Sequence, residues 1–146
     1  MKIQKFSMEY YDDVIQLWTN AGINVSSSDS KEEIERMLNR NPELFLIGIF
    51  KNKVVAVVMG GFDGRRGFVH HLAVDPKYQR SGYGTQIMSK LNENFRQKGV
   101  HKIHLFVEKR NEEAMDFYKT LGWEIREYLT MMSFVPDDDL YKKELK

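Results

Sequence analysis

Two periodicities dominate the hydrophobic pattern of this chain. Apolar residues recur at helical spacing in several stretches, which predicts amphipathic helices at Met8–Ala21, Lys31–Asn39, Thr85–Lys98 and Asn111–Leu121. Short apolar or alternating runs between turn residues predict strands at residues 2–6, Glu43–Phe50, Val54–Gly60, Phe68–Val74, Ile103–Val107 and Ile125–Val135. A strand can have a parallel neighbour only through a crossover, and the helix before Ile103 supplies one. The order therefore predicts an α/β fold around a mixed sheet.

Composition narrows the class of protein. The chain has 146 residues, so we expect a single domain over residues 1–146, with a polar tail at residues 136–146. No apolar run is long enough to cross a bilayer, and residues 1–13 lack the apolar stretch of a signal peptide, so a cytoplasmic location is expected. The chain has no cysteine, which excludes disulfides, thiolate metal ligands and an acyl-cysteine intermediate. The net charge is +1 with both signs interspersed, so neither nucleic acid nor a membrane is an expected partner.

Residues 68–85 carry the most specific chemistry. The apolar run Phe68–Val74 ends at Asp75-Pro76, because proline lacks an N–H and restricts the residue before it. A polar loop then leads to Gly82-Tyr83-Gly84-Thr85 at the start of a helix. Glycines there let the backbone direct several N–H groups at one point, and the helix start adds a partial positive charge. The junction predicts a site for a ligand that carries phosphate.

Two common phosphate motifs do not fit this junction. The P-loop pattern is absent, and the dinucleotide motif needs a third glycine where Ile87 stands. The sequence has Gln79-x-x-Gly82-x-Gly84 after Leu72-Ala73-Val74-Asp75-Pro76 instead, which resembles the acetyl-CoA signature of the GNAT N-acetyltransferase family. Downstream, Asn111-x-x-Ala114-x-x-Phe117-Tyr118-x-x-x-Gly122-Trp123 is similar to the second motif of that family. The resemblance covers nearly the whole chain, most specifically residues 68–123.

The resemblance implies a fold, a reaction and a cofactor. The GNAT fold has a mixed central β-sheet flanked by about four helices, and its central strands splay apart to admit the cofactor. The implied protein is an acyltransferase with acetyl-CoA as co-substrate and a small-molecule or peptide primary amine as acceptor, which attacks the thioester in a ternary complex. A longer acyl donor is an alternative with the same motif. A CoA-binding sensor or interaction module, catalytically weak, is the alternative outside enzymes.

The family motifs also imply cofactor-binding residues. The main chain of Leu72–Val74 would pair with the pantetheine arm like an added strand, and the N–H groups of Gln79–Thr85 would bind the pyrophosphate. Asn111 would cap its helix and contact the cofactor. The complete expected set is Leu72, Ala73, Val74, Gln79, Arg80, Ser81, Gly82, Tyr83, Gly84, Thr85, Asn111 and Tyr118. For Arg80, a solvent-facing position is an equal alternative.

Catalytic roles follow from the same resemblance. Tyr118 is the candidate general acid for the leaving thiolate, with a core aromatic as the alternative, and the backbone N–H of Leu72 is the candidate oxyanion donor. Many relatives carry a glutamate base before the Leu-Ala-Val run; here His70 or His71 stands nearby, and Glu108 is a third candidate. Strand alternation puts His70 on the face of Leu72 and His71 on the face of Ala73, so only one histidine should face the cleft. We expect no metal.

The C-terminal end departs from the family pattern. Many relatives have two strands after the Gly-Trp pair, but only one strand's worth of sequence follows Trp123 here before Asp137-Asp138-Asp139. The acceptor cleft is therefore either open or completed by a second subunit, and a homodimer is one expected arrangement. The first two predicted helices and the polar loop between them, Ala21–Ser30, would supply the remaining wall.

Overall fold

The computed structural model describes residues 1–145 and contains one five-stranded sheet in the order β1-β2-β3-β4-β5. The strands are β1 (Lys2–Lys5), β2 (Phe45–Phe50), β3 (Lys53–Phe62), β4 (Gly67–Val74) and β5 (Ile103–Leu105). The first four pair antiparallel, and β5 pairs parallel with β4. The helices are α1 (Tyr11–Asn20), α2 (Lys31–Arg40), α3 (Tyr83–Gln97) and α4 (Glu112–Thr120). The sheet is thus mixed and the fold is α/β, as predicted.

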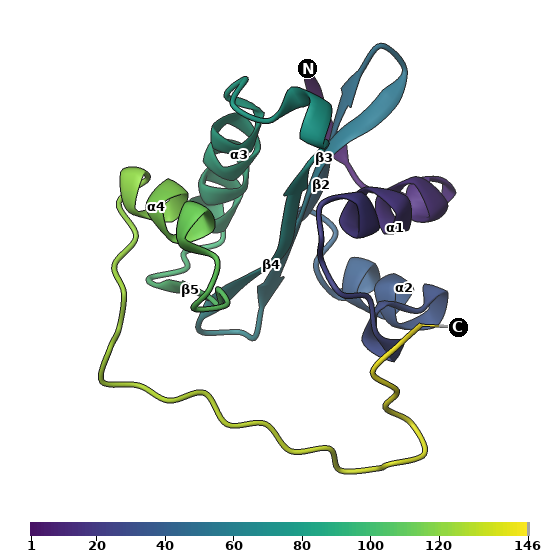
Figure 1. Cartoon of the computed structure of the whole chain (residues 1–146), viewed down its shortest axis with the longest axis vertical. Helices are drawn as coiled ribbons and strands as arrows, with labels where there is room; N and C mark the ends of the chain where they lie inside the picture. The colour runs from purple at the N-terminus through teal and green to yellow at the C-terminus, as the bar shows by residue number, and fades with distance from the viewer. Residues whose placement is uncertain (146) are drawn as a thin grey trace.

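The helices form two layers, with α1 and α2 on one face of the sheet and α3 and α4 on the other (Figure 1). Side chains alternate along β2, so Phe45 and Ile47 join Trp18 of α1 in one buried cluster. Leu46 points the other way and joins Leu91 and other residues of α3 in a second cluster. The sheet is therefore buried on both faces, and each face belongs to a different pair of helices.

Local signals explain where the elements begin and end. The Ser30 side chain accepts a hydrogen bond from the Glu33 N–H at 3.3 Å and so caps α2. Lys51 and Asn52 have φ of 51° and 62°, the left-handed pair of a type I′ hairpin turn, which closes β2 onto β3. Gly99 follows α3 with φ of 72° and ends it.

The predicted last strand does not form. Residues Ile125–Val135 contain no strand in the structure, and the chain from Glu124 onward runs as an extended tail across the molecule (Figure 1). The sequence has the pattern of a strand, but a strand needs a partner with which to exchange backbone hydrogen bonds. β5 is also shorter than predicted, since it ends at Leu105 and not at Val107. No helix within residues 1–145 is long and apolar enough to span a bilayer.

Candidate active site

The edge of β4 becomes free halfway along the strand. Gly67–Val69 pair with Ile103–Leu105, and β5 then ends, so the edge of β4 from His70 to Val74 faces no neighbouring strand within the described sheet. On its other edge β4 continues to pair with β3 as far as Val74. No strand of the described sheet pairs with Leu72–Val74 on this edge, where the Val74 carbonyl accepts the Gln79 side-chain amide, so a ligand can pair here like an added strand.

A β-bulge lies at the two histidines. Val57 of β3 pairs with Ala73, and Met59 pairs with His70, so β4 holds one extra residue between these pairs. His71 has a left-handed backbone with φ of 51°. An extra residue changes the face on which the following side chains lie.

The bulge corrects the predicted alternation. His70 lines a cleft on the α2 face, whereas Leu72 packs against the apolar cluster beneath α3, so the two residues do not share a face. His71 lies on the same face as Ala73, as predicted, because its ring contacts Trp18 at 4.9 Å between centroids and Ala73 belongs to the cluster of Trp18. The expectation that only one histidine faces the cleft is wrong, since both line it.

Asp29 holds His71 in place. Asp29 is buried, with 3% of its surface exposed, and its Oδ1 lies 3.1 Å from Nε2 of His71. Its Oδ2 accepts the N–H of Ser26 at 2.9 Å, and its carbonyl accepts the hydroxyl of Tyr11 at 2.7 Å. The indole N–H of Trp18 donates to the carbonyl of His71 at 2.9 Å. This network fixes both the backbone and the ring of His71.

The histidines open into a cleft of about 770 Å³. Its lining combines the loop before α2, α2 itself, β3, β4 and the end of the tail: Asn24, Ser26, Ser28, Asp29, Glu33, Ile34, Arg36, Met37, Arg40, Met59, His70, His71, Tyr141 and Lys143. Burial lowers the pKa of His70, and the neighbouring His71 lowers it further. The His70 imidazole is therefore predominantly neutral near pH 7.

The glycine loop lies on the opposite side, at the start of α3. Gly82 precedes the helix with φ of 84°, and the first turn of α3 contains no acidic residue. The Gln86 N–H donates to the Gly82 carbonyl at 3.0 Å, so the amides just before Gln86 lie ahead of the helical hydrogen-bond ladder. The Gln79 amide donates to the Val74 carbonyl at 3.1 Å and ties the loop to the end of β4. This arrangement suits an anion.

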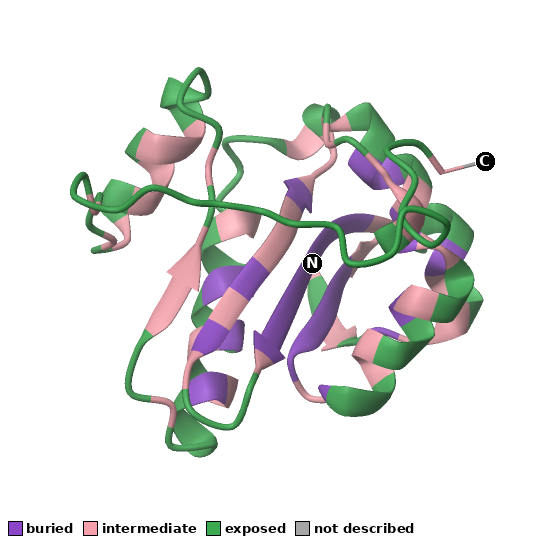
Figure 2. Cartoon of the chain, turned by 90° about the horizontal axis from the view of Figure 1, so that it is seen from below, coloured by how far each residue is buried: buried purple, intermediate pink, exposed green. Residues whose placement is uncertain are grey.

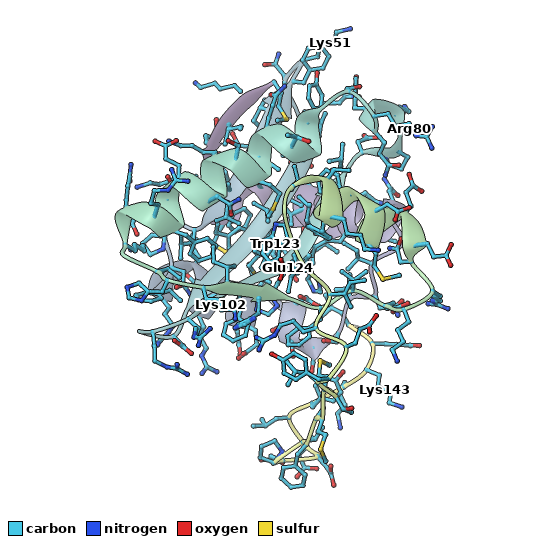
Figure 3. All side chains as sticks on the ribbon, turned by 90° about the vertical axis from the view of Figure 1, so that its left-hand side faces the viewer. Lys51, Arg80, Lys102, Trp123, Glu124 and Lys143 are labelled. Carbon is cyan, nitrogen blue, oxygen red and sulfur yellow. The ribbon has the colours of Figure 1, made fainter. Side chains whose placement is uncertain are left out.

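The loop also contacts α4. Arg80 has φ of 64° and lies 3.9 Å from Glu113, and Figure 3 shows it at the end of the molecule where α3 begins. A Cβ on Gly84 would lie 3.2 Å from Phe117, so this glycine allows α3 and α4 to approach closely. Ser81 and Thr85 are exposed and Tyr83 is half-buried beside Phe50.

Tyr118 lies in α4, and Asn111 immediately precedes this helix. Tyr118 packs against the same apolar cluster as Leu72 and Val74, between the rings of Phe117 and Trp123. Burial raises the pKa of Tyr118 to about 12, so its phenol stays protonated near pH 7. The Asn111 side chain accepts the Ala114 N–H at 3.1 Å, which makes it the predicted N-cap.

Comparison with known proteins identifies the family. Residues 10–123 match the model of the Acetyltransferase (GNAT) family. The chain belongs to the GNAT family. This GNAT acetyltransferase is 32% identical to an acetyltransferase of Pectobacterium atrosepticum over 97% of this chain and 100% of the relative. It is 31% identical to an acetyltransferase of Yersinia pseudotuberculosis, over 90% of this chain and 93% of the relative.

Solved structures share the fold of this acetyltransferase. The PaiA N-acetyltransferase of Thermoplasma acidophilum, solved in complex with coenzyme A, superposes with a TM-score of 0.76 at 20% identity, over 86% of this chain and 90% of that one. An aminoglycoside 6'-N-acetyltransferase of Acinetobacter haemolyticus gives 0.73 at 19% identity, over 94% of this chain and 100% of that one. The predicted GNAT fold is therefore confirmed.

Asp29 is a partner of His71 that no local pattern in the sequence of this acetyltransferase indicates. The two residues are far apart in the sequence and meet only after β4 packs beside the loop before α2. The third candidate base, Glu108, lies apart from the cleft: its carboxylate is exposed and bonds Arg110 at 2.6 Å. The structure thus brings together His70, His71 and Asp29, and leaves Glu108 outside.

Proposed function

We propose that this acetyltransferase moves the acetyl group of acetyl-CoA to a primary amine by direct attack in a ternary complex. The observation that carries the proposal is the free edge of β4 at Leu72–Val74. This edge lies between the glycine loop, which joins it through the Gln79–Val74 hydrogen bond, and the cleft lined by His70 and His71. A cofactor on the α3 side and an amine in the cleft meet there.

The main chain carries most of cofactor binding in this proposal. The N–H groups of Gln79–Thr85 bind the pyrophosphate at the acid-free start of α3, and Arg80 adds a charge contact. The free edge of Leu72–Val74 pairs with the pantetheine arm. Asn111 contacts the cofactor from the start of α4. The N–H of Leu72 then donates to the carbonyl oxygen of the acetyl group, where negative charge develops.

Attack forms a C–N bond and breaks the thioester C–S bond. The amine nitrogen adds to the acetyl carbonyl carbon, and the tetrahedral intermediate collapses with the bonding electrons leaving on sulfur. Tyr118 donates its phenolic proton to that sulfur. A thiol titrates near roughly 8.5 in water, well below the raised pKa of Tyr118, but burial raises the pKa of a thiol too. Burial raises both pKa values and leaves the thiol the stronger acid, so Tyr118 donates its proton as the C–S bond breaks and recovers it from solvent afterwards.

His71 accepts the proton of the amine, and Asp29 is its positioning residue. With Nε2–H donating to Asp29, the Nδ1 lone pair of the neutral ring is free to accept a proton. The carboxylate then stabilises the imidazolium that forms. His70 is the weaker candidate, since burial disfavours its charged form.

The charges of the cleft favour an acceptor that carries an anionic group beside its amine. Arg36 pairs with Glu33 at 3.0 Å, and Asp29 is occupied by His71. With His71 neutral, Asp29 keeps one negative charge, so Arg40 and Lys143 together leave the lining with a net positive charge. An amino acid or the end of a peptide fits this charge better than a polyamine does.

The direct test is CoA thiol release from acetyl-CoA over a panel of amines: lysine peptides, N-terminal peptides, amino acids, polyamines and aminoglycosides. The chain has no cysteine, so a thiol reagent reads only the CoA that is released. We expect release that depends on one class of amine, with a carboxylate-bearing class ahead of polyamines. Protein that binds CoA but releases none with any amine would contradict the proposal and support the CoA-binding sensor.

The base assignment predicts a graded loss at neutral pH. We expect His71→Gln to lower kcat about 10-fold to 30-fold at pH 7. This loss is smaller than the full contribution of a general base, because the fraction of amine that is already deprotonated reacts without one. Asp29→Asn should cost less, since it keeps the shape but favours the wrong tautomer. Both losses should shrink as the pH approaches the amine pKa, near roughly 10.4, where free amine needs no base.

The pH profile separates this role from a merely structural one. A structural defect would lower kcat by the same factor at every pH. The matched control is His101→Gln, which removes an exposed histidine outside the cleft and should leave the profile unchanged. A loss for His70→Gln that exceeds the loss for His71→Gln would move the base to His70.

A further inference from the structure

Aromatic and basic side chains share one face of β4 and β5. The parallel register pairs Phe68 with His104, and their rings lie 5.7 Å apart between centroids. The ring of His70, two residues further along β4, stacks on Phe68 at 6.4 Å. Arg66 lies on the same face just before β4, since its Nη1 is 3.4 Å from Nε2 of His104. Arg66, Phe68 and His70 therefore form a row that leads into the cleft, which His70 lines.

This surface, the β4–β5 face, consists of Arg66, Phe68, His70 and His104 and lies outside the buried clusters. Neither apolar cluster of the described chain includes the ring of Phe68, which is half-buried. Figure 2 shows β5 half-buried along its length and β4 with both buried and half-buried residues, whereas β3 is almost entirely buried. An aromatic ring that the fold leaves half-buried on a sheet is a surface that a ligand can cover.

Four cations lie near His104 on this face. Burial lowers the pKa of His104, and the positive charges that lower it further are those of Arg126, Arg66, Lys102 and Arg65. Lys102 comes directly before β5, where the register of the two strands places it beside Arg66. Within residues 1–145, none of the four cations forms a salt bridge with a carboxylate. Their positive charge is therefore available to attract an anionic ligand.

The turn between β3 and β4 joins these cations to the cleft. Oδ1 of Asp63 accepts the backbone N–H groups of Arg65 and Arg66, each at 2.7 Å, and so fixes the turn. These hydrogen bonds lower the pKa of Asp63, and the charges of Arg65 and Arg40 lower it further. The Asn41 side chain ties the end of α2 to the end of β3 by accepting a backbone N–H at 3.0 Å. A positive surface therefore extends from Arg40, which lines the cleft, to the start of β5.

We propose that the acceptor is a peptide with acidic side chains about four residues from its reacting amine, bound along the β4–β5 face with the amine in the cleft. This inference rests on the proposed function. From His70 to Arg66 the strand spans roughly 13 Å, which a single amino acid cannot bridge. Acidic side chains at that distance would meet Arg66 and Lys102, and Phe68 would pack against the chain between them. The reaction consumes an aliphatic primary amine, which polypeptides carry and nucleic acids lack.

Matched peptides test this inference through the kinetics of acetylation. The peptides differ only at the fourth and fifth residues from their single amine, which are both Glu, both Gln or both Arg. Each is made with that amine at its N-terminus or on one lysine side chain. We expect kcat/KM to fall in the order Glu, Gln, Arg, with Glu about 10-fold above Gln at low salt. The difference should shrink at about 0.5 M salt, where exposed charges are screened.

Charge reversal on the enzyme provides the second measurement. Arg65→Glu with Lys102→Glu replaces two exposed residues and should reverse the order of the peptides, while an amino acid too short to reach the face reacts as before. The matched control is Lys2→Glu with Lys53→Glu, which changes the net charge equally at exposed positions on other strands. This control should keep the preference for Glu. An unchanged order in the Arg65 and Lys102 variant overturns the inference.

Peptide binding without turnover separates the inference from the proposed reaction. Fluorescence anisotropy of C-terminally labelled peptides, with CoA present, should give a Kd for the Glu peptide about 10-fold below that of the Gln peptide. The same preference without CoA release from any amine would support the acidic-peptide site and overturn only the reaction. Equal Kd values for the two peptides overturn the inference, whether or not amines are acetylated. Tighter binding of a single-stranded RNA of equal charge also overturns it, in favour of a nucleic-acid ligand.

Discussion

Tyr118→Phe should lower kcat about 100-fold to 1,000-fold, which lies in the lower part of the range for general acid catalysis. The substitution keeps the ring that packs between Phe117 and Trp123 and removes only the proton donor. Cofactor affinity should change little, since the phenol acts on sulfur only as the C–S bond breaks. Steady-state kinetics with the best amine, together with the Kd of CoA, measures both effects.

The raised pKa of Tyr118 also predicts how kcat depends on pH. With a pKa of about 12, the phenol stays protonated through the alkaline range, so kcat of the native enzyme should not fall between roughly pH 7 and 10 through loss of this acid. Tyr10→Phe is the control, because Tyr10 is also half-buried but packs on the α1 face of the sheet. A Tyr118→Phe enzyme as fast as the native one would remove the acid assignment.

Gly82→Val should weaken CoA binding about 100-fold. Gly82 has φ of 84°, a conformation that a β-branched residue adopts only at a cost of roughly 1–3 kcal/mol. The loop relieves that strain by moving, and the cofactor must restore the original geometry of the amides to bind, so the cost appears in Kd at about 1.4 kcal/mol per tenfold change. Calorimetric titration with CoA measures this loss.

Gly99→Val separates loss of the site from loss of stability. Gly99 lies at the other end of α3 with φ of 72°, and a Cβ would meet nothing within 4 Å at either glycine. The two variants therefore carry the same kind of backbone strain, and both should lower the melting temperature. Only Gly82→Val should change the Kd of CoA. An equal loss of CoA affinity in both variants would show that strain in α3, and not the loop, governs binding.

The elements up to Trp123 could be predicted from the sequence because their signals are local. Helical spacing, the Ser30 cap of α2 and the hairpin turn at Lys51-Asn52 all act within a few residues of the chain. Whether Ile125–Val135 forms a strand could not be predicted in the same way. Its pattern is that of a strand, but whether a strand forms depends on a partner, and no local signal states where that partner is.

The residues of the cofactor loop lie together in the sequence, whereas those of the acceptor cleft come from separate elements. Gln79–Thr85 and the α4 motif are each contiguous stretches, so both can be recognised from residue types and spacing alone. The cleft depends on a bulge at His71 and on Asp29, which lies on another element. Alternation along β4 gave the wrong face for Leu72 because strand periodicity assumes that no residue is inserted.

The bulge in β4 divides the strand between two tasks. Before it, His70 faces the α2 side; after it, Leu72 and Val74 pack on the α3 side while their main chain stays free at the edge. In the proposed reaction the two substrates approach from opposite faces of one sheet, and they share only the backbone of this strand. Residues of α2, the preceding loop and the tail can therefore change to bind new amines while the glycine loop stays constant. In this way one cofactor site can serve enzymes with many different acceptors.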